Sequence, residues 1–309
     1  MGVGRRFFAG WTVHNRTMTE LREPRHGVYA AGMQGRAFPS MDFAQRLETV
    51  GLLRLPDDPF VLHPEEAKVL SPELSNGRAK SLSLQRGAAL RGAGEGPDAP
   101  RAEGLMARFG DWAEALIDRV APTYAGALER GRTSLRTRPV EAGAASPRKD
   151  DRRLHIDAFP SHPTGGRRIL RVFSNINPQG EPRRWEVGEP FEVHARRWIG
   201  RLRRPWPGEA WALEALGLTR ARRTPYDALM LGLHDAAKLD DDYQRDAPRR
   251  AEAFAAGSTW IVFTDSTVHA AIEGRYALEQ TFYLPLSALA APEAAPLRIL
   301  ERLTGRGLC

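Results

Sequence analysis

The chain has 309 residues, of which 42% are hydrophobic and 27% are charged. This composition is typical of a folded globular protein and excludes a disordered or fibrous one. The single cysteine, Cys309, excludes an intrachain disulfide and fits a reducing compartment. The formal net charge of +7 favours anionic partners, whether nucleic acid, phospholipid headgroups or acidic saccharides.

The first residues, MGVGRRFFAGWTVHNRT, contain no apolar run long enough for the core of a signal peptide. Arg6 stands where a myristoylation motif has serine or threonine. No stretch of the chain approaches the length of a membrane span. We therefore expect a cytoplasmic protein whose contact with the inner membrane, if it makes one, is peripheral.

The first half of the chain mixes short apolar segments with turns. Residues 63–70 read as a helix start, because Pro64 and two glutamates fall in its first turn. Residues 71–104 are rich in Ser, Gly, Pro and Arg and predict a loop anchored by leucines. Residues 105–135 have helical spacing, with Pro122 dividing them into two helices, and 138–150 resemble a linker.

The second half changes period. RRLHIDAF (152–159) and RRILRVFSNIN (167–177) predict strands, as do STWIVFTD (258–265) and RYALEQTFYL (275–284). Between them, 191–202 and 226–239 have the spacing of amphipathic helices. Strands at both ends without regular strand–helix alternation favour an antiparallel barrel or jelly roll with added helices over a doubly wound sheet.

His155 and Asp157 are the candidate ligands of a metal ion. Residues two apart on a strand point the same way, so both side chains can reach one ion while Leu154 and Ile156 pack behind. Two histidines and one carboxylate are the ligands that O₂-activating iron(II) enzymes use. The spacing alone is not specific, because His63-Pro64-Glu65 repeats it at a helix start, where the side chains diverge. His269, after the strand 258–265, is the candidate third ligand.

The segment RLHIDAFPSHPTGGRRILRVFSNINPQGEPRRWEVGEPFE (153–192) resembles the Kdo 3-hydroxylase family, which acts on 3-deoxy-D-manno-octulosonic acid of lipopolysaccharide. YDALMLGLHDAAKLDDDYQ (226–244) and GSTWIVFTDSTVHAAIEGRYALEQTFYLP (257–285) are similar to later blocks of that family. The resemblance covers most of 150–309 and is thinner upstream, where KSLSLQRGAALRG (80–92) is the most similar part.

The resemblance implies a mainly β protein with flanking helices and a double-stranded β-helix (jelly-roll, cupin-like) core. We expect an N-terminal supporting region at 1–145, a catalytic core at 146–290 with a helical insertion at about 189–245, and a C-terminal helix within 291–309. The implied activity is hydroxylation of carbon 3 of a Kdo sugar on Kdo-lipid A at the inner leaflet, using Fe(II), 2-oxoglutarate and O₂ and releasing succinate and CO₂. The resemblance assigns the iron to His155, Asp157 and His269.

2-Oxoglutarate needs a cation for its distal carboxylate, and the planar fork of arginine suits this. Arg275 is the main candidate, because this arginine usually opens the strand after the distal histidine in the wider superfamily. Its distance of six residues from His269 is shorter than the common spacing there. Arg171 is the alternative, with Arg168 less favoured, and Thr281, Asn175 and Asn177 are candidates for added hydrogen bonds unless the asparagines only form turns.

A second basic group lies in HARRWIGRLRRPWPGEAW (194–211), where three arginines follow one flank of an apolar stripe that carries Trp198. This pattern is typical of a helix lying on an anionic membrane, so these arginines are candidate substrate-binding residues: Arg197, Arg201 and Arg204. The alternative is a packed helix with solvated arginines. Asp240 to Asp242 and the pair His234–Asp235 are interpreted as capping or solvated residues.

Two other functions compete with this interpretation. The same iron chemistry could act on nucleic acid or a protein side chain, although we expect no nucleic-acid partner. A non-catalytic protein that binds anionic lipid or nucleic acid would need no three-ligand site, and its binding would depend strongly on salt.

Overall fold

The computed structural model describes residues 41–77, 79–140 and 146–309. The expectation about the N-terminal segment 1–17 lies outside these residues. Among the residues described, no helix combines the length and the apolar composition needed to cross a bilayer.

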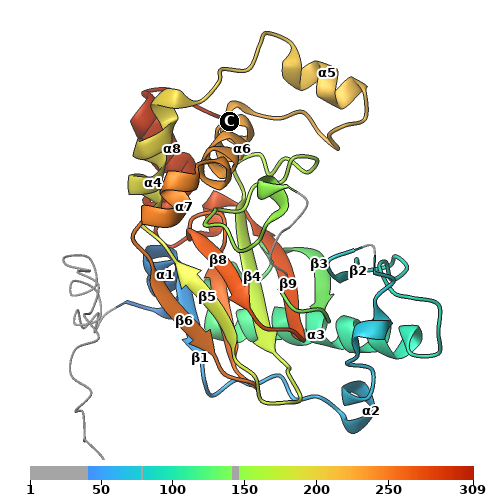
Figure 1. Cartoon of the computed structure of the whole chain (residues 1–309). Helices are drawn as coiled ribbons and strands as arrows, with labels where there is room; N and C mark the ends of the chain where they lie inside the picture. Colours follow the sequence, from blue (N-terminus) through green and yellow to red (C-terminus); the bar gives the residue numbers. More distant parts are fainter. Residues whose placement is uncertain (1–40, 78, 141–145) are drawn as a thin grey trace, which may run out of the picture. The chain divides into compact units, whose positions relative to one another are not determined.

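Two antiparallel sheets form the centre of the fold (Figure 1). The larger sheet has the strand order β1-β7-β4-β9-β3-β2 and the smaller one the order β6-β5-β8. Together they make the predicted jelly-roll core. The strands are β1 (Leu52–Leu55), β2 (Leu82–Leu84), β3 (Glu129–Arg136), β4 (Arg168–Asn175), β5 (Arg183–Val187), β6 (Arg250–Phe254), β7 (Thr259–Phe263), β8 (His269–Glu273) and β9 (Ala277–Leu284).

An aromatic core joins the two sheets. Phe173 on β4 and Trp260 on β7 stack at 5.1 Å between ring centres, and Trp185 on β5 meets both rings edge-on. Phe254 on β6 also stacks on Trp260, at 3.9 Å between ring centres. Because aromatic pairs of this kind bury large apolar areas, this cluster fixes the spacing of the sheets where they form the cavity described below.

Helices cover the sheets on two sides. Two short helices, α1 (Phe43–Val50) and α2 (Pro64–Ala67), precede the long helix α3 (Ala99–Val120) in the chain. α3 packs against the large sheet through residues such as Phe109, which is fully buried. A second helical layer packs against 154–156 and the start of β8. It consists of α4 (Phe191–Trp198), α6 (Pro225–Leu239), α7 (Asp241–Asp246) and α8 (Pro296–Thr304), while α5 (Glu209–Ala215) lies apart from it (Figure 1).

The part of 1–145 that the structure describes contributes three of the six strands of the large sheet. One of these, β3, replaces the second helix predicted after Pro122, so that prediction was wrong. β3 pairs with β9 from Glu129↔Tyr283 to Arg136↔Ala277 and with β2 on its other side. Two strand neighbours thus outweigh a local helical pattern, because secondary-structure propensity yields to tertiary pairing.

Most predicted elements of the second half are present. β4, β7 and β9 lie within the predicted strand segments, and α4 and α6 within or next to the predicted helices. Of residues 152–159, predicted as a strand, 152 and 153 belong to a turn and a bend, and the others form only a single bridge, between His155 and His269. The helices and strands of this half that the sequence did not reveal are β5, β6, β8, α5 and α7.

Candidate metal centre

His155 and Asp157 lie on an extended segment held against β8 and its preceding turn. The backbone amides of His155 and His269 each donate to the carbonyl of the other, at 3.0 and 2.8 Å, and the amide of Asp157 donates to the Thr264 carbonyl at 2.8 Å. Leu154 and Ile156 alternate with the two ligands and are fully buried in the helical layer. The period of two therefore turns the two polar side chains to one side, as predicted.

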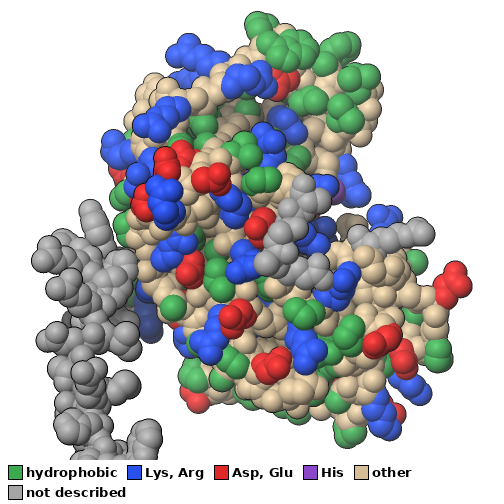
Figure 2. All heavy atoms as spheres, in the orientation of Figure 1, with side chains coloured by type: hydrophobic (Ala, Val, Ile, Leu, Met, Phe, Trp, Pro, Cys, Tyr) green, Lys and Arg blue, Asp and Glu red, His purple; other side chains and the backbone are tan. Residues whose placement is uncertain are grey.

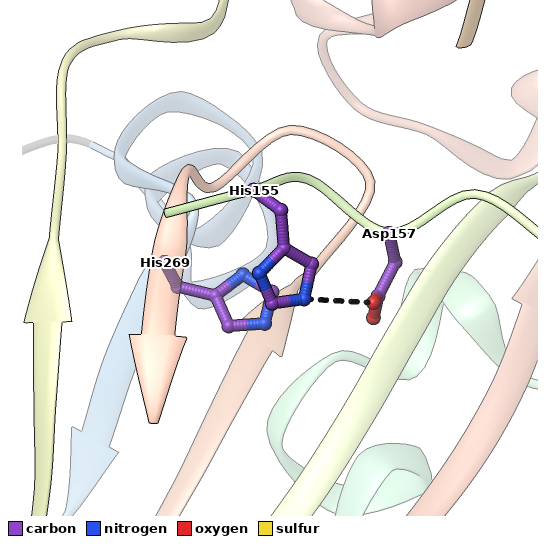
Figure 3. Close-up of side chains that lie close together, drawn as sticks. All are labelled: His155, Asp157 and His269. Carbon is purple, nitrogen blue, oxygen red and sulfur yellow. Dashed lines mark ion pairs between the residues drawn. The ribbon is translucent and has the colours of Figure 1, made fainter. Parts of the chain in front are cut away.

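The structure brings His155, Asp157 and His269 together (Figure 3). One ligand atom from each residue lies within 4.8 Å of those of the others, and all three residues are largely shielded from solvent. Nε2 of His155 is 3.8 Å from Oδ1 of Asp157, and the two imidazole centres are 4.7 Å apart. A single ion placed between these atoms would be reached by all three side chains.

Both imidazoles are held in the tautomer that leaves Nε2 free to bind a metal. Nδ1 of His155 lies 2.7 Å from the Arg153 carbonyl, and Nδ1 of His269 lies 2.8 Å from the Thr267 carbonyl. A carbonyl only accepts, so each Nδ1 carries the proton and each Nε2 has a free lone pair. A backbone partner of this kind orients metal-bound histidines in general. The donor set is thus two neutral imidazole nitrogens and one carboxylate, which fits iron(II).

Burial and charge set the protonation states of these groups. Burial lowers the pKa of His155 well below its usual value, and the nearby His269 lowers it further. Burial also lowers the pKa of His269. Burial alone would raise the pKa of Asp157, but Arg171 and the two histidines lower it below its usual range. At neutral pH the site therefore holds neutral imidazoles and an ionised carboxylate, which are the forms that bind a metal.

Arg171 on β4 forms an ion pair with the carboxylate of Asp157. Its guanidinium lies 3.1 Å from Oδ2 of Asp157 and 2.8 Å from Oε1 of Glu279 on β9. Glu279 in turn contacts Arg136 on β3 at 3.1 Å. With Oδ2 engaged by Arg171, Oδ1 of Asp157 is the oxygen turned toward His155. This buried network orients the carboxylate and supplies part of its counter-charge.

A cavity of about 260 Å³ opens beside the three candidate ligands. Five cationic side chains line it against two carboxylates, Asp151 and Asp157, so its walls favour anions. The cations are Lys80, Arg132, Arg136, Arg171 and Arg183. Apolar rings complete the lining, among them Trp185, which stacks on the ring of His269 at 5.1 Å between centres.

Two of the five cations form no ion pair with any residue that the structure describes. Arg183 on β5 is 1% exposed, and its Nη1 donates only to the Gly274 carbonyl at 3.2 Å, while its Nε has no partner. Burial, and then repulsion from Arg136, lowers the pKa of Arg183 to about 9. Arg132 is exposed at the cavity. The cavity thus holds one buried and one accessible cation that form no ion pair with the described residues.

Of the predicted co-substrate residues, Arg171 lines the cavity and Arg275 does not. Arg275 lies 3.4 Å from Glu181 and over the ring of Tyr276. Tyr276 has a positive φ of 57°, and β9 begins only at Ala277. The chain therefore turns between Arg275 and the strand, so the alternation of β9 does not extend to Arg275.

The other predicted polar groups divide in the same way. Thr281 is paired in register with Arg171, and its buried hydroxyl has no partner among the described residues. Asn175 donates to the carbonyls of Glu181 and Phe254, both at 2.9 Å. Asn177 accepts from the amide of Gln179 within the same turn. Both asparagines build the turn between β4 and β5, the alternative already considered for them.

The predicted substrate arginines do not line the cavity. Arg197 pairs with Glu189 at 2.8 Å, and Arg201 lies 5.9 Å from the ring centre of Trp198. Trp198 is 4% exposed, because α4 turns its apolar stripe into the helical layer. α4 therefore presents no tryptophan outward, as the packed-helix alternative predicts. Arg204 follows α4 in an exposed loop.

Several cavity residues were missed in the sequence, above all Arg183 and Trp185. Both lie on β5, where Arg183, Trp185 and Val187 alternate with two charged residues that face outward. The segment PRRWEVGEP (182–190) has this period of two and proline at each end. That pattern is the signal of a strand with one buried face, and it would have placed both side chains on the same side.

Comparison with known proteins agrees with this geometry. The sequence model of the 3-deoxy-D-manno-oct-2-ulosonic acid (Kdo) hydroxylase family matches residues 33–307. No curated protein gives a significant sequence match. Among solved structures, the chain is similar to the Kdo hydroxylase KdoO, a non-heme Fe(II) α-ketoglutarate-dependent dioxygenase, in complex with cobalt(II). The identity is 45%, the TM-score is 0.82, and the match covers 86% of this chain and 90% of that chain.

Two further KdoO structures are similar to the same extent. The complex with α-ketoglutarate and Fe(III) has 44% identity and a TM-score of 0.81, covering 86% of this chain and 90% of that chain. The complex with succinate and Fe(III) has 44% identity and a TM-score of 0.80, covering 86% and 89%. A family match over nearly the whole chain and this level of identity lead to one conclusion: the chain belongs to the Kdo hydroxylase family.

Proposed function

We propose that this member of the Kdo hydroxylase family hydroxylates carbon 3 of a Kdo sugar on Kdo-lipid A, with iron(II) held by His155, Asp157 and His269. The observation that carries the proposal is the convergence of two Nε2 lone pairs and one carboxylate oxygen beside a cation-lined cavity. A jelly-roll scaffold for a non-catalytic binder would require none of these three groups.

The bound iron, with 2-oxoglutarate and O₂, supplies the oxidising power that converts a carbon–hydrogen bond to an alcohol and releases succinate and CO₂. The residues of the chain bind, orient and shield. Backbone carbonyls hold the two imidazoles, and Arg171 holds the carboxylate. Trp185 and Phe159 line the cavity next to the ligands and exclude water from its walls. No general base is needed, because the protein itself moves no proton from the substrate.

Arg183 is our candidate for the distal carboxylate of 2-oxoglutarate. It is the buried cavity arginine without an ion pair among the described residues, and a dianionic co-substrate would supply the missing charge. Glycine at position 274 allows the backbone of Arg183 to pack closely against it, because a Cβ at position 274 would lie only 2.9 Å from Cα of Arg183. Arg171 already serves two carboxylates and would orient Asp157 instead.

Replacing Arg183 by methionine should weaken 2-oxoglutarate binding at least about 30-fold, because a buried charge-assisted contact is lost. Arg275→Met is the matched control and should leave the affinity unchanged, since Arg275 does not line the cavity. Calorimetric titration of the Co²⁺-loaded protein with 2-oxoglutarate measures both. The assignment fails if Arg275→Met weakens binding and Arg183→Met does not.

The accessible cation, Arg132, is suited to the substrate. Kdo carries a carboxylate and lipid A carries phosphates, so the sugar that enters the cavity is anionic. We propose that Arg132 and Lys80 meet these groups at the mouth while the sugar ring approaches the metal. Kdo-lipid A would place this step at the inner leaflet of the cytoplasmic membrane, where the enzyme would be a peripheral protein.

The product tests the function directly. Protein loaded anaerobically with Fe(II) and then given 2-oxoglutarate, air and Kdo-lipid A should add one oxygen atom to the Kdo part of the lipid. One succinate should form for each oxygen added. Mass spectrometry of the lipid, RNA and peptides treated in parallel gives the answer. An oxygen added to RNA or peptide but not to Kdo-lipid A would assign the enzyme to a different substrate.

A further inference from the structure

The segment 201–223, which contains α5, has an unusual concentration of exposed apolar side chains. α5 has no buried residue. Of the eight large hydrophobic side chains exposed among the described residues, four lie in this segment. They are Trp206 (54% exposed), Trp211 (63%), Leu216 (73%) and Leu218 (58%). Figure 2 shows hydrophobic side chains gathered over α5. A seven-residue helix with no buried residue is marginal alone, so we interpret this segment as a surface that a partner covers.

The charges of the same segment select its partner. Residues 201–223 contain six arginines, two glutamates and no other charged residue. Both glutamates are already paired, Glu209 with Arg203 at 2.7 Å and Glu214 with Arg222 at 3.0 Å. The remaining arginines form no ion pair with any residue that the structure describes: Arg201, Arg204, Arg220 and Arg223. Tryptophan and leucine flanked by unneutralised arginine fit the interface of an anionic bilayer.

The segment is joined to the cavity through the loop that follows the candidate ligands. The amide of Arg220 donates to the Ser161 carbonyl at 3.0 Å, and the guanidinium of Arg223 donates to the Pro160 carbonyl at 2.5 Å. His162 in this loop lies within the electrostatic influence of both Arg220 and Arg132. Positive charge therefore continues from the cavity to the base of the apolar segment.

We propose that residues 201–223 dock this protein on a bilayer with anionic headgroups, with Trp206, Trp211, Leu216 and Leu218 entering the interface and the free arginines contacting phosphates. The proposal rests on the proposed function in one respect: a lipid-anchored sugar explains why the docking surface adjoins the cavity. If the bilayer contacts this segment, the lipid part of the substrate lies in the bilayer and its sugar lies close to Arg132 at the cavity mouth.

Co-sedimentation with vesicles that contain no Kdo tests the docking surface independently of catalysis. The wild-type protein should bind vesicles of phosphatidylethanolamine and phosphatidylglycerol in equal parts, and bind phosphatidylcholine vesicles much less. The triple variant Trp211→Ser/Leu216→Ser/Leu218→Ser should bind about tenfold less tightly. Arg204→Gln/Arg220→Gln should lose about fivefold per arginine at low salt. Because these side chains are exposed, thermal melting should be unchanged.

Val61→Ser and Arg101→Gln are the matched controls, since Val61 is 66% exposed and Arg101 lies on α3, both outside the segment. Both should bind vesicles as the wild type does. The proposal is overturned by a wild type that binds neither vesicle, by equal losses in control and test variants, or by a triple variant that binds normally. It is also overturned if the triple variant changes only self-association in sedimentation velocity, which would assign the surface to a second copy of the chain.

Succinate formation with a water-soluble Kdo glycoside separates this proposal from the proposed function. The triple variant should match the wild type on the soluble sugar and fall below it on vesicle-embedded Kdo-lipid A. A wild type inactive on both sugars would refute the function and leave the vesicle result to decide the docking surface.

Discussion

Replacing His155 by alanine should reduce the affinity for Co²⁺ or Fe²⁺ by more than about 100-fold. Loss of a residue that only hydrogen-bonds a metal ligand already reduces metal affinity about 10–100-fold, and loss of a ligand itself should reduce it further. The remaining pair, Asp157 and His269, would leave the ion held by two side chains. Asp157→Asn should have a similar effect, since an amide keeps the shape and loses the charge that Arg171 balances. Calorimetric titration of the metal-free protein with Co²⁺ measures both losses without any turnover.

The chain contains its own control for this experiment. His63-Pro64-Glu65 has the same histidine–acid spacing, but His63 lies exposed at the start of α2, where its ring pairs with Glu66 at 3.9 Å. His63→Ala should therefore bind Co²⁺ as the wild type does. An unchanged affinity in His155→Ala would mean that the three side chains gather for a purely structural reason.

Replacing Arg168 by methionine should lower the free energy of unfolding by about 3–5 kcal/mol, because it leaves a buried carboxylate without its partner. Arg168 and Asp265 are each 1% exposed, with Nε and Nη2 of the guanidinium 2.7 and 3.1 Å from the two carboxylate oxygens. Burial raises the pKa of Asp265 even with Arg168 beside it. Urea denaturation of the metal-free protein measures the change.

Arg119→Met is the comparison for this variant. Arg119 pairs with Asp58, but it is exposed, and an exposed ion pair contributes about 1 kcal/mol or less. The double variant Arg168→Met/Asp265→Leu should recover much of the lost stability, since no charge is then left alone in the interior. A single Arg168→Met variant within about 1 kcal/mol of the wild type would show that the pair is solvated in practice. Arg168 is three residues from Arg171 on β4, so its side chain points to the opposite face of the sheet. It does not line the cavity and is not a candidate for co-substrate binding.

The sequence predicted that His155 and Asp157 share one side of an extended segment because the pattern around them is local. Leu154 and Ile156 alternate with His155 and Asp157, and the extended backbone needed for that alternation forms even though only one bridge holds it. His269 was a candidate from its place after the strand 258–265, and the resemblance assigned it, but nothing in one sequence gives the distance in space between residues 157 and 269. The structure supplies that link in the two backbone hydrogen bonds between His155 and His269.

The cationic residues were harder to predict, since their roles depend on pairing between strands. Arg171 lies in a strongly apolar strand. Its partner on β9 is Thr281, and its ion pair with Glu279, two residues from Thr281, follows from the register of β4 with β9, which the sequence does not encode locally. Arg275 shows the converse: counting residues from His269 assumed an unbroken strand, and the left-handed backbone at Tyr276 breaks the count. The arginines around Trp198 predicted a surface helix at α4, but the exposed apolar side chains lie in the segment around α5, which has no regular period.

Anomalous diffraction from crystals grown with Co²⁺ tests whether His155, Asp157 and His269 bind one metal ion, because it locates the metal without assuming an activity. We expect one strong cobalt peak bonded to Nε2 of His155, Nε2 of His269 and a carboxylate oxygen of Asp157, with open positions facing the 260 Å³ cavity. Cobalt bound instead at His234 and Asp235, or at the acidic start of α7, with no density between the two histidines, would contradict it.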